Sequence, residues 1–258
     1  MAPKLLGGQA PPHSGGFSQT CPALRGSRVT NHQSRVSSVG YNAHVIVLAI
    51  DTCDLRGSVA LLRDEAALAL LAHDSSEEYS SWLLPAVSRV LGEAGLQMGD
   101  VAAYSVAAGP GSFTGVRVGL TTVKAWAEVY GKPVAAVSRL EAIAAQATEA
   151  ARAVAAFVDA HRGQLFGAIY RKEESILVRI DDEMVIAPEK FVETAVGLVG
   201  GERISWVSSD ADVLARAAAW KEWEKRGERI EQVSATLAPI IGRIGLRHVR
   251  EGDRKSVV

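Results

Sequence analysis

The chain has 258 residues, of which 28 are Lys or Arg and 29 are Asp or Glu, so its formal net charge is −1. This near-neutral balance excludes a protein that binds nucleic acid or an anionic membrane through its overall charge, so a partner would have to supply most of the attraction to any RNA. The hydrophobic fraction of 48% is enough for the core of one large domain or two small lobes. No apolar run approaches the roughly 20 residues that a membrane span needs, and we expect no membrane association.

Cysteine and histidine usage argues against disulfide and metal chemistry. Cys21 and Cys53 form no C-x-x-C pair, which is typical of the reducing cytosol and predicts a cytoplasmic protein. No two of the six histidines have the i, i+4 spacing of a helical metal site. We therefore predict no metal ligands.

The first segment, residues 1–44, differs in composition from the rest. It contains Lys4, Arg25, Arg28 and Arg35 but no acidic residue, and it is dense in Gly, Ser and Pro. Such a segment cannot bury enough apolar surface to order itself, so we predict a disordered leader. An organelle transit peptide has a similar composition, but it would need an amphipathic helix, which we do not find.

Three apolar segments follow and predict three antiparallel strands. "VIVLAI" (45–50) is a continuous aliphatic run, as expected of a strand buried on both faces. "SVALLRD" (58–64) follows a polar turn and predicts a hairpin partner. "AALALLAH" (66–73) is too short for a helix and has no cap, so it predicts a third strand.

Helices and strands then alternate. A helix is predicted from Ser75 to Gly95, with Pro85 in its first turn or at a kink. The next elements are two strand–helix pairs: strand 101–108, helix 113–130, strand 133–138 and helix 139–150. Three antiparallel strands followed by such crossovers are typical of the ribonuclease-H-like core of actin, sugar kinases and Hsp70 ATPase lobes.

The second half repeats this theme imperfectly. The expected strands are 153–160, 165–171, 176–180 and 204–209, and the expected helices are 188–199, 211–225 and 235–250. We thus predict a two-lobed, actin-like α/β fold of the Hsp70 type. The predicted domains are a leader (1–44), an N-terminal lobe (45–141) and a C-terminal lobe (142–258), whose last helix packs back on the first lobe.

A glycine-rich block, "AGPGSFTGVRVG" (108–119), precedes the helix at 113–130. It resembles a phosphate-binding loop but fails both tests. A Walker loop counted from Gly111 or Gly109 requires glycine where Val116 or Thr114 stands. A dinucleotide fingerprint also requires glycine at Thr114.

Gly115 and Gly119 instead form a small-residue strip one helical turn apart. Two glycines weaken a helix by about 1 kcal/mol each relative to alanine, which is tolerated where another backbone must come close. That backbone belongs either to the protein's own sheet or to a partner, and the sequence physics alone leaves both open.

Four segments, taken together, resemble one family. They are "LAIDT" (48–52), "AAGPGSFTGVRVGLTTVKAWA" (107–127), "PVAAVSRLEAIA" (133–144) and "VDAHRGQLFGAIY" (158–170). Over residues 45–250 the chain resembles the bacterial TsaB (YeaZ) family. The resemblance implies a two-lobed fold and a role in making N6-threonylcarbamoyladenosine at position 37 of tRNAs that read ANN codons.

The resemblance also implies partners. Members of this family are inactive relatives of the catalytic subunit TsaD and form a heterodimer with it, which the ATPase TsaE joins. Without TsaD the same helices are expected to pair in a homodimer, and tRNA is expected to be met only through the complex. No cofactor of the chain's own is implied; ATP or ADP and Mg²⁺ belong to the assembled complex.

The expected partner interface follows the family's motif. It comprises two residues of the L-L-P helix and the glycine block: Leu83, Leu84, Gly111, Ser112, Phe113, Thr114, Gly115, Val116, Arg117 and Gly119. The helix at 78–85 lacks the histidines that hold the metal in TsaD-like catalysis, so no catalytic residue is expected. The family also usually ends in a P-x-Y-x-R-type segment, which the C-terminal residues 254–258 do not provide.

Asp51 and Asp159 lie at matching places in the two lobes. In active members of the fold class such residues face the phosphates and magnesium of a nucleotide, so the pair could be a vestigial nucleotide site. Alternatively, each carboxylate accepts hydrogen bonds from its own turn. The first interpretation keeps an ATP-dependent phosphotransferase, or another nucleotide-binding enzyme of this fold, as the alternative function.

Overall fold

The computed structural model describes residues 44–73, 76–148, 151–174 and 176–252. The predicted leader, apart from His44, and the C-terminal segment from residue 253 lie outside the described residues. Residues 42–258 form one compact unit, which contains both β-sheets.

The first sheet has the strand order β3-β2-β1-β4-β5. Its strands are β1 (Ile46–Asp51), β2 (Ser58–Arg63), β3 (Ala66–Ala72), β4 (Ala103–Ala107) and β5 (Val134–Val137). β1 is antiparallel to β2 and parallel to β4, and every residue of β1 is buried. The predicted antiparallel trio followed by parallel crossovers is therefore confirmed.

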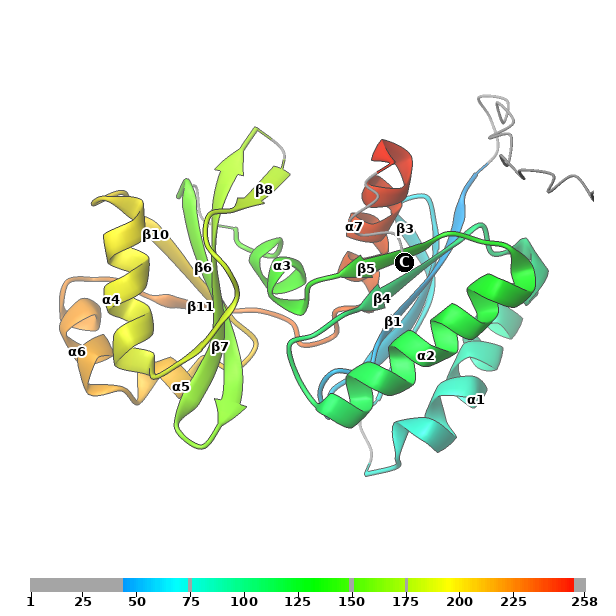
Figure 1. Cartoon of the computed structure of the whole chain (residues 1–258), viewed down its shortest axis with the longest axis horizontal. Coiled ribbons are helices and arrows are strands. Elements are labelled where there is room, and N and C mark those ends of the chain that lie inside the picture. The colour runs from blue at the N-terminus through cyan, green and yellow to red at the C-terminus, as the bar shows by residue number, and fades with distance from the viewer. Residues whose placement is uncertain (1–43, 74–75, 149–150, 175, 253–258) are drawn as a thin grey trace, which may run out of the picture. The chain divides into compact units, whose positions relative to one another are not determined.

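Helices cover both faces of this sheet (Figure 1). Along β1, Leu48 and Ile50 point into a core shared with α1 (Tyr79–Glu93) and α2 (Phe113–Tyr130). Val47 and Ala49 point to the opposite face, where α7 (Ala238–Glu251) packs. This alternation is the two-residue period of a strand that is buried on both sides. A short 3-10 helix, η1 (Met98–Asp100), precedes β4.

α7 lies unusually close to the first sheet. A Cβ atom added at Gly245 would lie 2.1 Å from the Ser105 Oγ, and one added at Gly242 would lie 2.5 Å from a Leu62 methyl carbon. The Ala238 amide also donates a hydrogen bond to the Ser58 Oγ at 3.0 Å. The last described helix thus completes the core of the first lobe.

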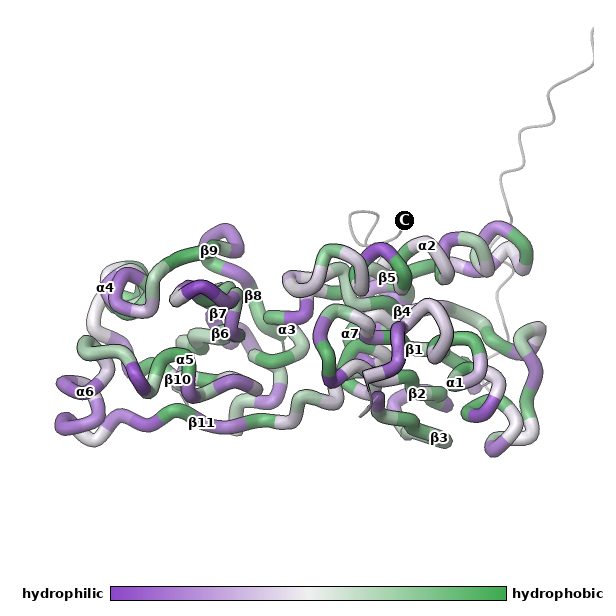
Figure 2. The backbone as a smooth tube through the Cα atoms, turned by 90° about the horizontal axis from the view of Figure 1, so that it is seen from below, coloured by the Kyte–Doolittle hydropathy of each residue, from purple (hydrophilic) through white to green (hydrophobic). Residues whose placement is uncertain are grey.

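The second sheet has the order β11-β10-β6-β7-β8, and β9 pairs with β7. Its strands are β6 (Ala153–His161), β7 (Gln164–Glu173), β8 (Ile176–Arg179), β9 (Met184–Ile186), β10 (Ile204–Ser208) and β11 (Ile230–Gln232). One face carries α3 (Arg139–Ala144) and the other carries α4 (Pro188–Val199), α5 (Asp212–Ala215) and α6 (Ala218–Lys225). Figure 2 shows that α6 is mostly hydrophilic, as expected of an outer helix.

Two apolar clusters pack the helices against the second sheet. One apolar cluster contains residues from both sheets together with α3 and α7, so the two lobes share a core. The outer core of the second lobe is aromatic, with Trp206 against Phe191, Trp220 and Trp223 at ring-centroid distances of 5.3–6.5 Å.

The structure corrects several predicted boundaries. The helix predicted from Ser75 begins at Tyr79, and the helix predicted over 139–150 ends at Ala144. The helix predicted over 211–225 is broken into α5 and α6 around Arg216 and Ala217. β9 and β11 were not predicted, because strands of three residues carry almost no periodicity.

Candidate functional site

The glycine block folds against the turn that follows β1. Gly109 has φ = 102°, a conformation that favours glycine. The Ser112 amide donates a hydrogen bond to the Cys53 carbonyl at 2.7 Å. The Ser112 Oγ then caps α2 by accepting a hydrogen bond from the Gly115 amide at 3.3 Å. The start of α2 is therefore fixed to the end of β1.

The small-residue strip of α2 faces this same turn. A Cβ atom added at Gly115 would lie 2.0 Å from the Thr52 carbonyl oxygen, and one added at Gly119 would lie 2.6 Å from the Thr52 Oγ1. The Thr52 hydroxyl donates a hydrogen bond to the Gly115 carbonyl at 2.7 Å. The expectation that Gly115 and Gly119 contact a partner is therefore wrong, because the chain's own Thr52 occupies the space beside both glycines, with its backbone at Gly115 and its side chain at Gly119.

The other predicted interface residues divide by exposure. Ser112, Thr114 and Arg117 are exposed, whereas Gly111 and Val116 are half-buried. A Cβ atom at Gly111 would lie 2.1 Å from the Cys53 carbonyl oxygen, so this glycine also serves the chain's own packing.

Large apolar side chains are exposed on both α1 and α2, among them Leu84 and Phe113. The exposed fraction is 69% for Phe113 and 55% for Leu84. Leu83, by contrast, is 1% exposed and belongs to the core, which corrects its assignment to the interface. The Arg117 guanidinium lies 3.7 Å from the centroid of the Phe113 ring. Such an exposed aromatic–arginine pair is a typical anchor of protein–protein interfaces.

Asp51, at the end of β1, is fully buried. Its Oδ1 accepts a hydrogen bond from the Cys53 amide at 2.9 Å, and its Oδ2 lies 3.8 Å from the Nε of Arg139. Burial raises the pKa of Asp51, and the positive charge of Arg139 opposes that rise. Arg139 is itself 2% exposed and also donates a hydrogen bond to Asp54 at 2.6 Å.

Asp54 connects this buried pair to the second lobe. The Arg56 guanidinium lies 3.0 Å from Asp54, also pairs with Asp210, and donates to the Ser209 carbonyl at 3.3 Å. Burial alone would raise the pKa of Asp54, but the charge of Arg139 and the hydrogen bonds from both arginines hold it below its ordinary value.

Cys53 lies beside this cluster and is buried. Burial and the neighbouring Asp51 raise the pKa of its thiol well above the ordinary value. The thiol therefore stays protonated at neutral pH and is a poor nucleophile.

Asp51 and Asp159 differ in exposure, since Asp51 is fully buried and the side chain of Asp159 is 42% exposed. Asp159 accepts a hydrogen bond from the His161 amide at 2.6 Å, as Asp51 does from Cys53, so each carboxylate closes its own turn. The open side of Asp51 faces Arg139. Within the described residues, no group of three or more His, Cys, Asp or Glu residues is placed to hold a metal ion.

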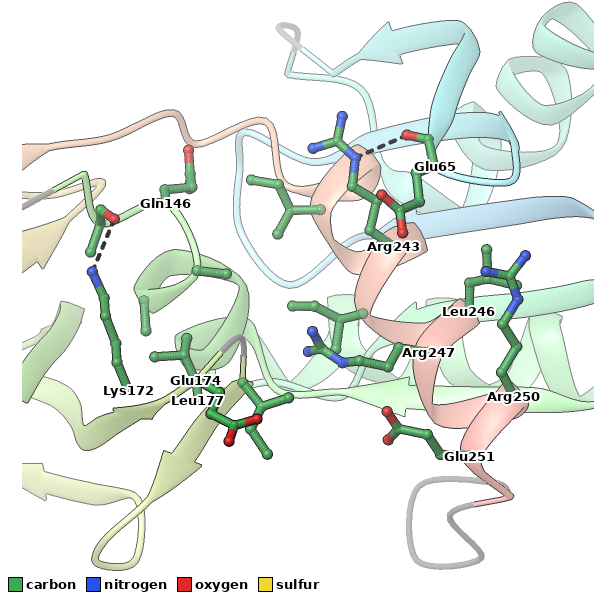
Figure 3. A pocket seen from close by; sticks show the side chains of 16 residues that line it. Glu65, Gln146, Lys172, Glu174, Leu177, Arg243, Leu246, Arg247, Arg250 and Glu251 are labelled. Atoms are coloured by element: carbon green, nitrogen blue, oxygen red, sulfur yellow. Dashed lines mark hydrogen bonds between the residues drawn. The ribbon is translucent and has the colours of Figure 1, made fainter. Parts of the chain in front are cut away.

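A cavity of about 780 Å³ lies elsewhere, between α7, the end of α3, and β7 and β8 (Figure 3). Arg243, Arg247 and Arg250 project from one face of α7, and the sequence spacing i, i+4, i+7 could have revealed this stripe. Lys172, three glutamates and several Ala, Ile and Leu side chains line the same cavity, so its positive charges are largely balanced by negative ones.

Two lobes, each formed by a mixed sheet covered by helices on both faces, define an α/β protein of the two-lobed, actin-like class. The model of a protein family described as "TsaD: tRNA N6-adenosine threonylcarbamoyltransferase" matches residues 72–222, more than half of the chain. The chain belongs to this family and, within it, to the TsaB (YeaZ) group.

The most informative relatives carry that name. The tRNA threonylcarbamoyladenosine biosynthesis protein TsaB of Bacillus subtilis is 33% identical over 143 residues, which cover 55% of this chain and 62% of that protein. TsaB of Escherichia coli is 29% identical over 70% of this chain and 75% of that protein. The structure of YeaZ from Pseudomonas aeruginosa matches with a TM-score of 0.63 and 26% identity, over 81% of this chain and 94% of that one.

Among the residues described, none of the helices is both long enough and apolar enough to cross a bilayer.

Proposed function

We propose that the chain is a non-catalytic subunit that binds TsaD in the complex making N6-threonylcarbamoyladenosine at position 37 of tRNAs reading ANN codons. Relatives named as biosynthesis proteins of this nucleoside support the pathway. TsaE and tRNA then join through the complex, and nucleotide chemistry takes place outside this chain.

The exposed Phe113 is the observation that carries this proposal. It is the first residue of α2, beside the point where Gly115 is clamped on Thr52. α2 lies beside α1, which exposes Leu84 (Figure 1). A rigid helix start that displays an aromatic ring loses little conformational entropy on binding. We therefore place the TsaD contact on the α1–α2 face, at Leu84, Ser112, Phe113, Thr114 and Arg117.

Binding to TsaD tests the contact directly. Phe113→Ser and Leu84→Ser should each weaken the affinity for TsaD about 10- to 100-fold, as expected for truncated interface anchors. Val129→Ser is the matched control, because Val129 is 76% exposed at the other end of α2. If both variants bind TsaD as tightly as the control does, the contact lies elsewhere.

Complementation tests the function itself. The gene should restore threonylcarbamoyladenosine in cells depleted of their own TsaB, and the Phe113→Ser variant should restore less. A folded, expressed chain that leaves the modification absent would contradict the proposed role.

A further inference from the structure

A continuous series of charged contacts runs from the end of β1 to the end of β10. In order, it consists of Asp51, Arg139, Asp54, Arg56 and Asp210. Three carboxylates are thus held by two guanidinium groups. Nothing in the proposed TsaD contact uses them.

The positive charge of Arg139 is shared between Asp54, at 2.6 Å, and the fully buried Asp51, at 3.8 Å. Both side chains are enclosed, and Asp51 Oδ2 and Arg139 Nε lie 3.8 Å apart. Neither atom makes a hydrogen bond within the described residues, so the two groups interact through their charges alone. A buried charge without a partner is strongly unfavourable, so the positive charge of Arg139 compensates a carboxylate that would otherwise need another cation.

The backbone holds Arg139 in this position. Its amide donates a hydrogen bond to the Gly109 carbonyl at 2.6 Å, within the glycine block. The Ser138 Oγ caps α3 by accepting hydrogen bonds from the Leu140 and Glu141 amides at 3.1 and 3.3 Å. Arg139 is therefore placed by the start of the helix that connects β5 to β6.

Arg56 extends the series into the second lobe. It reaches Asp54 in its own lobe and both Asp210 and the Ser209 carbonyl after β10. Its side chain is partly exposed, so solvent reaches this end of the series while the Arg139 end is sealed.

We propose that Arg139 is a built-in cation that occupies the place beside Asp51 where active members of the fold class hold a metal–phosphate group, and that Arg56 ties the second lobe to it. The chain's own charges then add to the shared apolar core in holding the two lobes together, with no nucleotide needed.

Chemical rescue tests the role of Arg139. Arg139→Ala should lower the melting temperature by roughly 10 °C, because it leaves a buried carboxylate unpaired. Millimolar methylguanidinium should raise the melting temperature of this variant but not that of the unmodified chain. Equal responses in both proteins, or an Arg139→Ala variant as stable as the unmodified chain, would overturn the proposal.

A double variant without the charges of Asp51 and Arg139 tests the same role if Arg139→Ala does not fold. Asp51→Asn combined with Arg139→Met removes both buried charges and leaves Asp54 paired with Arg56. This variant should recover most of the lost stability, with no response to methylguanidinium. Failure of this double variant to recover stability would also overturn the proposal.

Calorimetry with Mg-ATP tests the claim that Arg139 occupies the position beside Asp51 and so prevents nucleotide binding. The unmodified chain should give no saturable heat. Saturable binding that Asp51→Asn abolishes would show that a nucleotide displaces Arg139, and would contradict the proposal independently of TsaD binding.

Small-angle scattering tests the tie between the lobes. Arg56→Ala should broaden the distribution of interatomic distances in the intact chain. Arg216→Ala is the matched control, because Arg216, directly after α5, pairs with Asp212 in the same lobe. Identical scattering from both variants would mean that Arg56 does not restrain the lobes.

Discussion

At the scale of single residues, Gly115 and Gly197 have the same helical backbone but opposite surroundings. Gly115→Ala places a methyl group against the Thr52 carbonyl, whereas Gly197→Ala places one in open space. We expect the first change to lower the free energy of unfolding by about 3 kcal/mol and the second to raise it by up to about 1 kcal/mol. Chemical denaturation measures both free energies of unfolding. Equal values for the two variants would contradict the close contact between Gly115 and the Thr52 carbonyl.

The Tyr104 hydroxyl is buried and has no hydrogen-bond partner among the described residues. Burial, with a smaller contribution from Tyr130, raises its pKa from 10.0 to about 12. Because the folded-state pKa is the higher one, its contribution to stability is complete below pH 10 and is lost as the pH rises through about 12.

Tyr104→Phe should therefore be at least as stable at neutral pH and lose less stability between pH 10 and 12. Urea unfolding at several pH values measures this dependence. An unchanged alkaline slope in the variant would contradict the assignment.

Residue patterns predicted the special positions but not their partners. The sequence showed that something must approach Gly115 and Gly119 closely, yet Thr52 lies far away along the chain. Asp51 was recognisable from its place at a strand end, whereas Arg139 looked like an ordinary helix residue. Both partnerships depend on long-range packing, which local periodicity does not encode.

At the scale of elements, the stability of the first sheet should depend on the packing of α7 against it. Gly245→Val would force α7 away from Ser105 and Ala135, while Gly92→Val on the open side of α1 is a matched control. Amide hydrogen exchange in β1 and β4 should accelerate only in the Gly245 variant. Unchanged protection there would show that the sheet does not depend on α7.

Elements with strong local signals were predicted well. α2 has its predicted bounds because Ser112 caps its start and Gly131, at φ = 63°, ends it. The break between α5 and α6 was missed, since Ala and Arg around it are good helix formers. β11 exists only because β10 pairs with it.

At the scale of the whole molecule, the α1–α2 face should also associate with itself. An exposed apolar surface without a partner favours a symmetric dimer. We expect the chain alone to sediment as a dimer at micromolar concentrations and Phe113→Glu to sediment as a monomer. If the unmodified chain sediments as a monomer, the predicted self-association is wrong, and the proposed contact with TsaD is not affected by that result.

The distribution of the five tryptophans gives the two lobes separate optical signals. Trp206 and Trp220 are buried in the second lobe, whereas Trp82 and Trp126 are half-buried on α1 and α2. A protein that covers the α1–α2 face would shield only the latter pair from acrylamide. Fluorescence quenching of the unlabelled chain therefore reports where a partner docks.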